Sequence, residues 1–185
     1  MVAQTKDYSH HHNGGGIVAD SIDNYIAAHH PKKNQWISYR KKWEANKFDL
    51  LYVLLETTSE CNLTCPMCIH SAEYDKAPRM KDDVFELALK NIAEMKVPSV
   101  CMNQVNEPLL DKKIFERIAR VKELPDVVDV HMNTNAVLLD ETKSKKLIES
   151  GLTKILIGFD AFSKTTYEEM RTGGASYDEV KENIL

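Results

Sequence analysis

Residues 50–68 decide the fold and read Leu-Leu-Tyr-Val-Leu-Leu-Glu-Thr-Thr-Ser-Glu-Cys-Asn-Leu-Thr-Cys-Pro-Met-Cys. An apolar run at 50–55 comes first, and a short polar segment at 56–60 follows it. Cys61, Cys65 and Cys68 come next, with the spacing C-x3-C-x2-C. Three thiolates on one loop can hold three irons of a cubane cluster and leave the fourth iron without a protein ligand. An iron with an open position can bind a substrate or a cofactor, so this pattern indicates a reactive centre.

The order of these features resembles the radical S-adenosylmethionine (radical SAM) superfamily. The resemblance implies that Cys61, Cys65 and Cys68 hold a [4Fe-4S] cluster whose open iron is chelated by S-adenosyl-L-methionine. It also implies reductive cleavage of that cofactor to a 5′-deoxyadenosyl radical, which abstracts hydrogen from a peptide or small-molecule substrate. An external reductant such as a flavodoxin or ferredoxin is implied as a partner. Met67, where the family often has an aromatic residue, would lie against the adenine ring as a soft apolar side chain.

A non-catalytic metal-binding module is the alternative, namely a zinc or iron-sulfur site completed by Cys101 or a histidine. Zinc sites prefer paired C-x2-C knuckles and four Cys or His ligands. Only one such pair, Cys65 and Cys68, occurs in this sequence. Cys101 falls in an expected strand, where a free cysteine behaves as a small apolar residue.

Composition and charge narrow the class of partner. The 185 residues are 43% hydrophobic, which supports a real core, and the formal net charge is −4. This charge gives no general attraction to nucleic acid or to an anionic membrane. Apolar runs such as 50–55 are far too short to cross a bilayer. We therefore expect a cytoplasmic protein without a nucleic-acid or membrane partner, and that location would suit an oxygen-sensitive cluster.

Three sections are expected along the chain. Residues 1–16 are polar and end in three glycines, which predicts a flexible tail. Residues 17–49 predict an N-terminal helical extension. From 50 to 185 strands and helices alternate. The strands are expected at about 50–56, 99–103, 127–133 and 154–159, and the helices at about 82–95, 112–122, 140–151 and from 177.

Side-chain patterns place the expected helices in more detail. In the first helix, Asp82 or Asp83 is the expected N-cap, and the expected apolar stripe comprises Val84, Leu87, Ala88, Ile92 and Met95. In the second, Ile114, Ile118 and Val121 should face inward. The third should begin at an Asp140 cap and end at Gly151 in the left-handed region.

Repeated strand-helix units predict an α/β fold with a parallel sheet and right-handed crossovers. The resemblance implies a partial (β/α) barrel of the radical SAM type, with about four β/α units present. The family core usually has six units, so we expect 50–185 to be a core truncated at its C-terminus, an N-terminal fragment of a longer enzyme. Tyr167, Arg171 and Gly173-Gly174 are most similar to the branch that carries a SPASM or twitch extension.

Ligands in such folds gather at the carboxyl ends of the strands, where polar residues follow each expected strand. After the second strand, Val105-Asn106-Glu107-Pro108 resembles the family's Gly-Gly-Glu-Pro motif, which binds the amino group of the methionine moiety. After the third, Asn133-Thr134-Asn135 resembles the family's Thr-Asn-Gly segment, and the amides of Asn133 and Asn135 suit ribose hydroxyls or the methionine carboxylate. Each segment could instead be an ordinary loop or turn.

The fourth expected strand is followed by Asp160, in a stretch that resembles the family's Ser-x-Asp-Gly/Ala turn with Gly158 in place of the serine. Asp160 would orient the ribose or cap the next helix. Arg171 matches an arginine common in the peptide-modifying branch, where it would pair with the cofactor carboxylate in a forked geometry. A solvated surface arginine is the alternative for Arg171.

Overall fold

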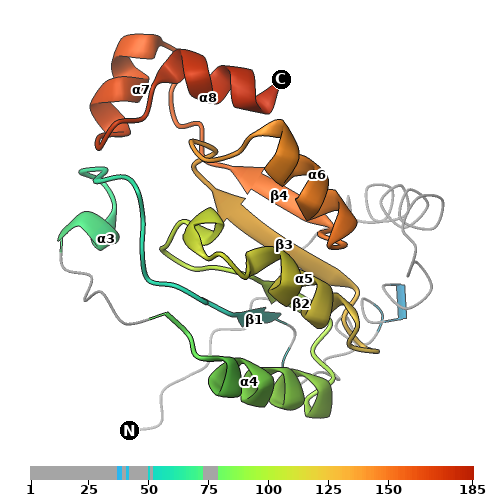
Figure 1. The fold of residues 1–185 in the computed structure, drawn as a ribbon. Coiled ribbons are helices and arrows are strands. Elements are labelled where there is room, and N and C mark those ends of the chain that lie inside the picture. Colours follow the sequence, from blue (N-terminus) through green and yellow to red (C-terminus); the bar gives the residue numbers. More distant parts are fainter. Residues whose placement is uncertain (1–36, 39–40, 42–49, 51, 73–78) are drawn as a thin grey trace, which may run out of the picture. The chain divides into compact units, whose positions relative to one another are not determined.

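The structure, a computed structural model, describes residues 37–38, 41, 50, 52–72 and 79–185. The expected tail at 1–16 and nearly all of the expected extension at 17–49 lie outside the described residues. From residue 50 onward, helices alternate with the strands of one sheet (Figure 1). No helix in the described part of the chain has both the length and the apolar character needed to cross a bilayer.

The sheet has four parallel strands in the order β1-β2-β3-β4, which confirms the expected fold class. Their bounds are β1 (Tyr52–Leu54), β2 (Ser99–Cys101), β3 (Asp129–Thr134) and β4 (Lys154–Ile157). In the register, Cys101 pairs with Leu54 on one side and with His131 on the other. The first, second and fourth strands are shorter than the expected ranges, because the hydrogen-bonded pairing between strands ends where the polar loops begin. These loops therefore all start from the same edge of the sheet.

Three helices connect successive strands and lie along one face of the sheet (Figure 1). They are α4 (Asp82–Glu94), α5 (Ile114–Lys122) and α6 (Glu141–Glu149). Short helices interrupt two of the loops, α3 (Ile69–Ala72) after the cysteines and the 3-10 helix η1 (Pro108–Leu110) after β2. After β4 come α7 (Lys164–Met170) and α8 (Tyr177–Ile184). Helix α7 was not expected from the sequence, and it begins where the Ser163 hydroxyl accepts a hydrogen bond from Thr166 N.

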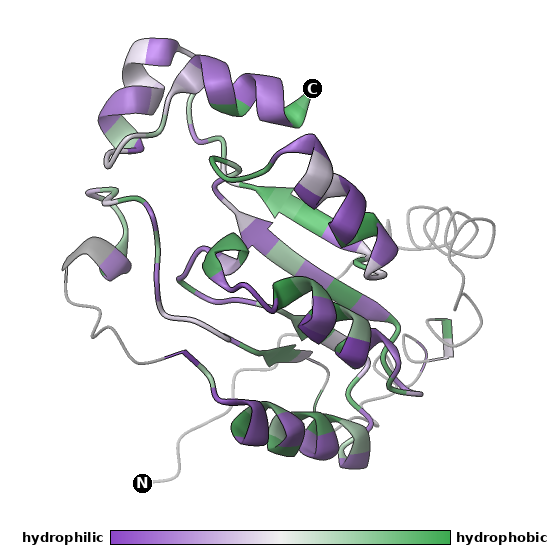
Figure 2. Ribbon diagram, viewed as in Figure 1, coloured by the Kyte–Doolittle hydropathy of each residue, from purple (hydrophilic) through white to green (hydrophobic). Residues whose placement is uncertain are grey.

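The core lies between the sheet and these helices. Val100 and Val130, in the middle of the sheet, are fully buried. Helix α5 buries Ile114, Ile118 and Val121, as expected from its spacing. Figure 2 shows that α4 and α5 carry both apolar and polar residues, whereas α6 is mostly hydrophilic and buries only Leu147. On the opposite face of the sheet, alternate residues such as Tyr52, Leu54 and Leu156 keep about two fifths of their surface exposed.

The expected apolar stripe of α4 is confirmed only in part, because Ile92 is buried and Ala88 packs against the core, while the other members are exposed. Phe85, Leu89 and Ile92 are buried, whereas Val84 and Leu87 are about half exposed. Both sets repeat at helical spacing, so the spacing alone could not choose between them. Phe85 packs under a guanidinium group of α5, and this contact belongs to tertiary structure that a helical period does not contain.

The N-cap expected at Asp82 or Asp83 is also wrong, because α4 begins one residue earlier. Lys81 occupies the N-cap position without a side-chain hydrogen bond. Asp82 instead accepts a hydrogen bond from Lys113 Nζ at 2.5 Å. The Asp82 carboxylate therefore links α4 to Lys113 at the start of α5 and does not cap its own helix. The expected ends of α6 are confirmed, since Asp140 accepts from Lys143 N and Gly151 has φ +82°.

The buried side chain of Arg117 joins α5 both to the residue that ends η1 and to the residue that lies just before α4. Arg117, only 4% exposed, donates from Nη1 to Asp111 Oδ2 at 2.8 Å. Its Nη2 donates to the Met80 carbonyl at 2.7 Å. A charge at this depth is tolerated only when it is paired and hydrogen-bonded, as it is here. Arg117 thus holds in place the residue directly before the N-cap of α4.

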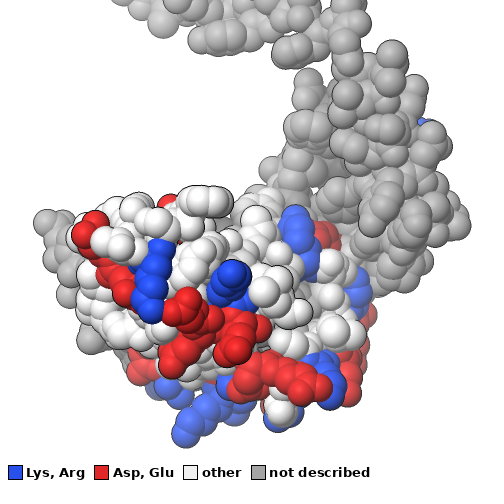
Figure 3. Space-filling view, turned by 90° about the horizontal axis from the view of Figure 1, so that it is seen from above, with Lys and Arg blue, Asp and Glu red and all other residues white. Residues whose placement is uncertain are grey.

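Acidic and basic side chains are interspersed on the face shown in Figure 3. The described residues on this face form no continuous basic area.

Candidate functional site

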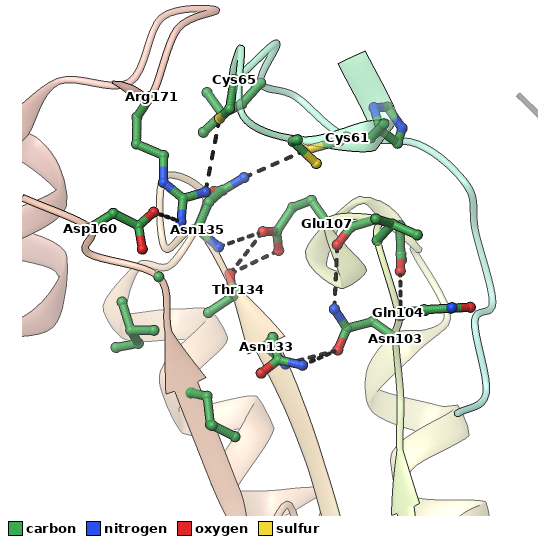
Figure 4. A pocket seen from close by; sticks show the side chains of 18 of the residues that line it. Cys61, Cys65, Asn103, Gln104, Glu107, Asn133, Thr134, Asn135, Asp160 and Arg171 are labelled. Atoms are coloured by element: carbon green, nitrogen blue, oxygen red, sulfur yellow. Dashed lines mark hydrogen bonds and ion pairs between the residues drawn. The ribbon is translucent and has the colours of Figure 1, made fainter. Parts of the chain in front are cut away.

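A cavity of about 540 Å³ opens at the carboxyl ends of the strands. Its size is that of sites for small ligands and cofactors. Its lining comes from the loops after all four strands (Figure 4). Every site residue expected from the sequence lines it, namely Cys61, Cys65, Met67, Cys68, Asn106, Glu107, Asn133, Asn135, Asp160 and Arg171.

The three cysteines lie on the loop between β1 and α3, and all are free thiols. A turn brings two of them together, because Cys68 N donates to the Cys65 carbonyl at 3.0 Å. Two of the thiols receive side-chain donors from other loops. Asn135 Nδ2 lies 3.9 Å from Cys61 Sγ, and Arg171 Nη1 lies 3.9 Å from Cys65 Sγ (Figure 4).

The three thiols are a donor set that fits an iron-sulfur cubane. In the part of the chain that the structure describes, no three or more His, Cys, Asp or Glu side chains converge on one ion. Three thiols spread over one loop suit a cubane, because each thiol binds a different iron at its own corner of the cluster. Burial raises the pKa of the Cys61 thiol, although a hydrogen bond from the Leu63 backbone acts against it. Iron must therefore displace a proton from Cys61 when it binds.

The structure does not bring Cys101 to this loop. Cys101 is fully buried in β2, donates from Sγ to Asn103 Oδ1 at 3.4 Å, and is not among the residues that line the cavity. His70 does line the cavity, but its Nε2 lies 2.7 Å from the Ser59 carbonyl, to which it must donate. Cys101 is thus not placed as a fourth ligand, whereas His70 stays at the cavity with its ring orientation fixed by this hydrogen bond.

Glu107 links the loop after β2 to the turn after β3. Its carboxylate is 1% exposed and accepts hydrogen bonds from Leu109 N at 3.1 Å and Asn135 N at 2.9 Å. The Thr134 hydroxyl donates to the same carboxylate, 2.9 and 3.0 Å from its two oxygens. Burial raises the pKa of Glu107, while the hydrogen bonds from Asn135, Leu109 and Thr134 act to lower it. The carboxylate therefore sets the relative position of two loops that line the cavity.

Asn103 organises the floor of the cavity and was missed from the sequence. Its Oδ1 accepts from Asn133 N at 2.8 Å, and its Nδ2 donates to the Asn106 carbonyl at 3.4 Å. The available signal was the period of two along a strand, because Asn103 lies two residues beyond Cys101 and points to the same side. Gln104, Leu156 and Ile157 are further lining residues that sequence reasoning did not select.

Asn106 offers a donor that no protein group uses. Its Oδ1 accepts from Gln104 N at 3.2 Å, which fixes the orientation of the side-chain amide. The Nδ2 atom then has no hydrogen-bond partner, although Asn106 is only 6% exposed and lines the cavity. Buried donors are nearly always satisfied, so an oxygen of a bound ligand is the natural partner. The residues present thus fit a polar cofactor beside the thiols.

Asp160 and Arg171 form an ion pair at the side of the cavity (Figure 4). The Nε atom of Arg171 is buried without a partner. Gly158, where the resembling turn has serine, lies directly beneath the guanidinium, because a Cβ atom there would overlap Arg171 Nη2. Met67 also lines the cavity and is 51% exposed, so its apolar surface is open to a planar ring.

The segment after α7 holds the cysteine loop in place, which sequence reasoning also missed. Thr64 N donates to the Thr172 carbonyl at 2.8 Å, and the Thr172 hydroxyl donates to the Thr64 carbonyl at 2.6 Å. Gly173 has φ +102°, and a Cβ atom there would lie 2.8 Å from Thr64 N. Only the absence of a side chain permits this close approach.

Comparison with known proteins gives three findings. Residues 55–185 match the family model described as the radical SAM superfamily. A GTP 3′,8-cyclase of Limosilactobacillus fermentum is 32% identical over 127 residues, which cover 66% of this chain and 37% of the relative. A probable GTP 3′,8-cyclase of Pyrococcus abyssi is 31% identical over 130 residues, which cover 70% of this chain and 41% of the relative. The chain thus spans about two fifths of the curated relatives it matches.

Among solved structures, native anSMEcpe with bound AdoMet aligns with a TM-score of 0.61 at 24% identity. The alignment covers 73% of this chain and 39% of that chain. At this identity the likeness is one of fold, and it agrees with the parallel β/α arrangement described above.

Proposed function

Because the chain belongs to the radical SAM superfamily, we propose that its cavity holds S-adenosyl-L-methionine beside a [4Fe-4S] cluster bound by Cys61, Cys65 and Cys68. Membership identifies an enzyme class and its two cofactors. When bound and reduced, these cofactors supply a 5′-deoxyadenosyl radical that abstracts hydrogen from a substrate. The single observation that carries the site assignment is the convergence of three free thiols and unused buried donors in one cavity.

The chain's own residues hold and orient the cofactor. The unpartnered Asn106 Nδ2 and Arg171 Nε suit the oxygens of the methionine carboxylate or the ribose. Met67 offers an apolar surface to the adenine. Asn133 and Asn135, at the end of β3, add amide groups for ribose hydroxyls. Asp160 holds the guanidinium of Arg171 and can also accept from a ribose hydroxyl.

Glu107 would act chiefly by positioning. Protein donors already occupy both oxygens of its carboxylate, so its main effect is to place Thr134 and Asn135 against the cavity. Carbonyls of the surrounding loop then complete the environment of the cofactor ammonium group. A rigid lining of this kind excludes water and holds the reacting carbon near its substrate.

We also propose candidate substrates for the enzyme and the branch of the superfamily to which it belongs. The curated relatives are named GTP 3′,8-cyclases, which supports GTP as the small molecule to test first. The pattern of Tyr167, Arg171 and Gly173-Gly174 supports the SPASM or twitch branch and a peptide substrate as the second candidate. A flavodoxin or ferredoxin in the cytoplasm would supply the electron.

Anaerobic reconstitution with iron and sulfide tests the cofactor site. The reduced protein should give the electron paramagnetic resonance (EPR) signal of a cubane, and the signal should change when S-adenosyl-L-methionine is added. Serine at Cys61, Cys65 or Cys68 should abolish the cluster, and Cys101→Ser, the matched control, should retain it. A zinc-loaded protein, or a cluster whose spectrum ignores the cofactor, would contradict the proposal. Formation of 5′-deoxyadenosine with GTP or a peptide added then addresses the substrate.

A further inference from the structure

We infer that Arg171 is a positioning residue that raises the reduction potential of the cluster through Cys65, and that Gly158 is glycine because it must admit this guanidinium. The inference rests on the proposed function, since it assumes a cluster on the three thiols. It assigns to Arg171 an effect on the metal centre beyond contact with the cofactor.

The contact with sulfur is direct. Arg171 Nη1 donates to Cys65 Sγ at 3.9 Å, within the range of N–H···S hydrogen bonds. Its Nη2 is paired with Asp160, on the side away from the thiol (Figure 4). The side chain is 18% exposed, so solvent screens its charge only partly. The ion pair is thus a dipole with its positive end toward Cys65.

The absence of a side chain at Gly158 leaves the space that the Arg171 guanidinium occupies. A Cβ atom at this position would overlap Nη2 of Arg171, so even alanine would push the guanidinium away from its present position. The backbone of Gly158 is itself anchored, because its N–H donates to the Thr134 carbonyl at 2.9 Å. The glycine cannot easily move aside, and the arginine would have to.

The arginine is also fixed relative to the cysteine loop by backbone contacts. Thr172, the next residue, exchanges two hydrogen bonds with Thr64, the residue before Cys65. Arg171 N donates to the Tyr167 carbonyl at 2.7 Å and so closes the end of α7. These contacts make the alignment of guanidinium and thiol a built feature of two adjoining segments.

The electrostatic consequence has a definite sign. Reduction adds negative charge to a cluster, and hydrogen bonds to its ligand sulfurs stabilise the more negative form. A guanidinium held against Cys65 therefore makes the cluster easier to reduce. Loss of the guanidinium, or its displacement by a side chain at 158, should make reduction harder.

The test is an EPR-monitored redox titration of the reconstituted protein. For Arg171→Gln, the ratio of reduced to oxidised cluster at a fixed potential should fall about tenfold, equivalent to a midpoint about 59 mV more negative. Gly158→Ala should shift the midpoint in the same direction, although the arginine is intact. In the double variant the two effects should not add, because both act through one contact.

Arg79→Gln is the matched control. Arg79 is an exposed arginine paired with Glu60, at the start of the same loop, with 2.5 Å between Nη2 and Oε2. Its removal changes the net charge equally but touches no thiol, so the midpoint should stay near that of the wild type. Arg171→Lys, which keeps the charge and shortens the reach, should give an intermediate shift. It also serves as the test if Arg171→Gln assembles too little cluster.

The failures are distinguishable. A wild-type protein that assembles no cubane, or a cubane indifferent to S-adenosyl-L-methionine, would overturn the proposed function and the inference with it. A responsive wild-type cluster whose midpoint is the same in Arg171→Gln, Arg171→Lys and Arg79→Gln would overturn the inference alone. Additive shifts in the double variant would overturn the role given to Gly158.

Discussion

Replacing Asp129 with asparagine should remove most of the stability that a charged His131 gives the fold. His131 Nδ1 donates to Asp129 Oδ2 at 2.6 Å, and the hydroxyl of Ser99 donates to the same oxygen at 2.8 Å. The hydrogen bond to Asp129, followed by that to Cys101, raises the pKa of His131 to about 9. Burial acts to raise the pKa of Asp129, but its hydrogen bonds outweigh burial and hold that pKa well below the usual range.

The magnitude follows from the difference between folded and unfolded states. The pKa of His131 rises from 6.5 to about 9 on folding. At about 1.4 kcal/mol per pKa unit, this shift is worth roughly 3 kcal/mol. Because the folded pKa is the higher one, the stabilisation is complete below about pH 6.5 and is lost as the pH rises through about 9. Cys101 supplies part of the shift, so Asp129→Asn should cost about 2–3 kcal/mol near pH 6.

Urea denaturation followed by far-ultraviolet circular dichroism measures this loss. With a slope of about 2 kcal/mol per molar urea, the midpoint should fall by roughly 1 M near pH 6. Near pH 10 the two proteins should differ much less, because His131 is then neutral in both. NMR titration of the imidazole gives a second readout, and its pKa should move toward 6.5 in the variant. Asp83→Asn, which removes an exposed carboxylate from α4, is the control and should change stability by less than about 0.5 kcal/mol.

Two results would refute this account of Asp129. One is a wild-type His131 that titrates near its ordinary value. The other is a loss of stability in Asp129→Asn that is the same at pH 6 and pH 10, since a pH-independent loss would reflect packing or neutral hydrogen bonds and not the charge on the imidazole.

Three further outcomes are expected from single contacts. Gly173→Ala should cost more than Gly174→Ala in unfolding experiments and should lower the iron retained after reconstitution, because both have φ above +100° but only the first approaches Thr64. Equal effects of the two would contradict the close contact. Arg117→Ala should cost about 3–5 kcal/mol by leaving a buried carboxylate unpaired, whereas Arg120→Ala, in an exposed pair, should cost far less, both measured by urea denaturation. Ile118→Ala, at a fully buried position of α5, should cost about 2–5 kcal/mol in the same assay, and a loss below 1 kcal/mol would place that helix outside the core.

The fold class could be predicted from sequence because its signals are local. Apolar runs, caps and a terminating glycine lie within a few residues of the elements they define, as at Asp140 and Gly151 around α6. The convergence of the site could also be predicted, because parallel strands bring their carboxyl ends together whatever the loops contain. The buried face of α4 could be predicted only in part, at Ala88 and Ile92, since two helical stripes compete and the packing of Phe85 decides between them.

The parts of the site that sequence reasoning missed depend on contacts between distant residues. The Thr172 hydroxyl donates to the carbonyl of Thr64 in the cysteine loop, 108 positions earlier in the chain. No periodicity or sequence motif predicts this contact. The same holds for Gly158, whose lack of a side chain is explained only by the position of Arg171. Asn103 is different, because strand alternation contained the information needed to find it.

The contact between Thr64 and Thr172 has a consequence for biosynthesis. At about 5–20 residues per second, a ribosome needs roughly 5–20 s to make the 108 residues between them. During that interval the nascent chain displays its thiols before the segment that braces them exists. Iron delivery should accordingly follow translation, and a ribosome-stalled chain that stops short of Thr172 should be a poor acceptor for the cell's iron-sulfur carriers.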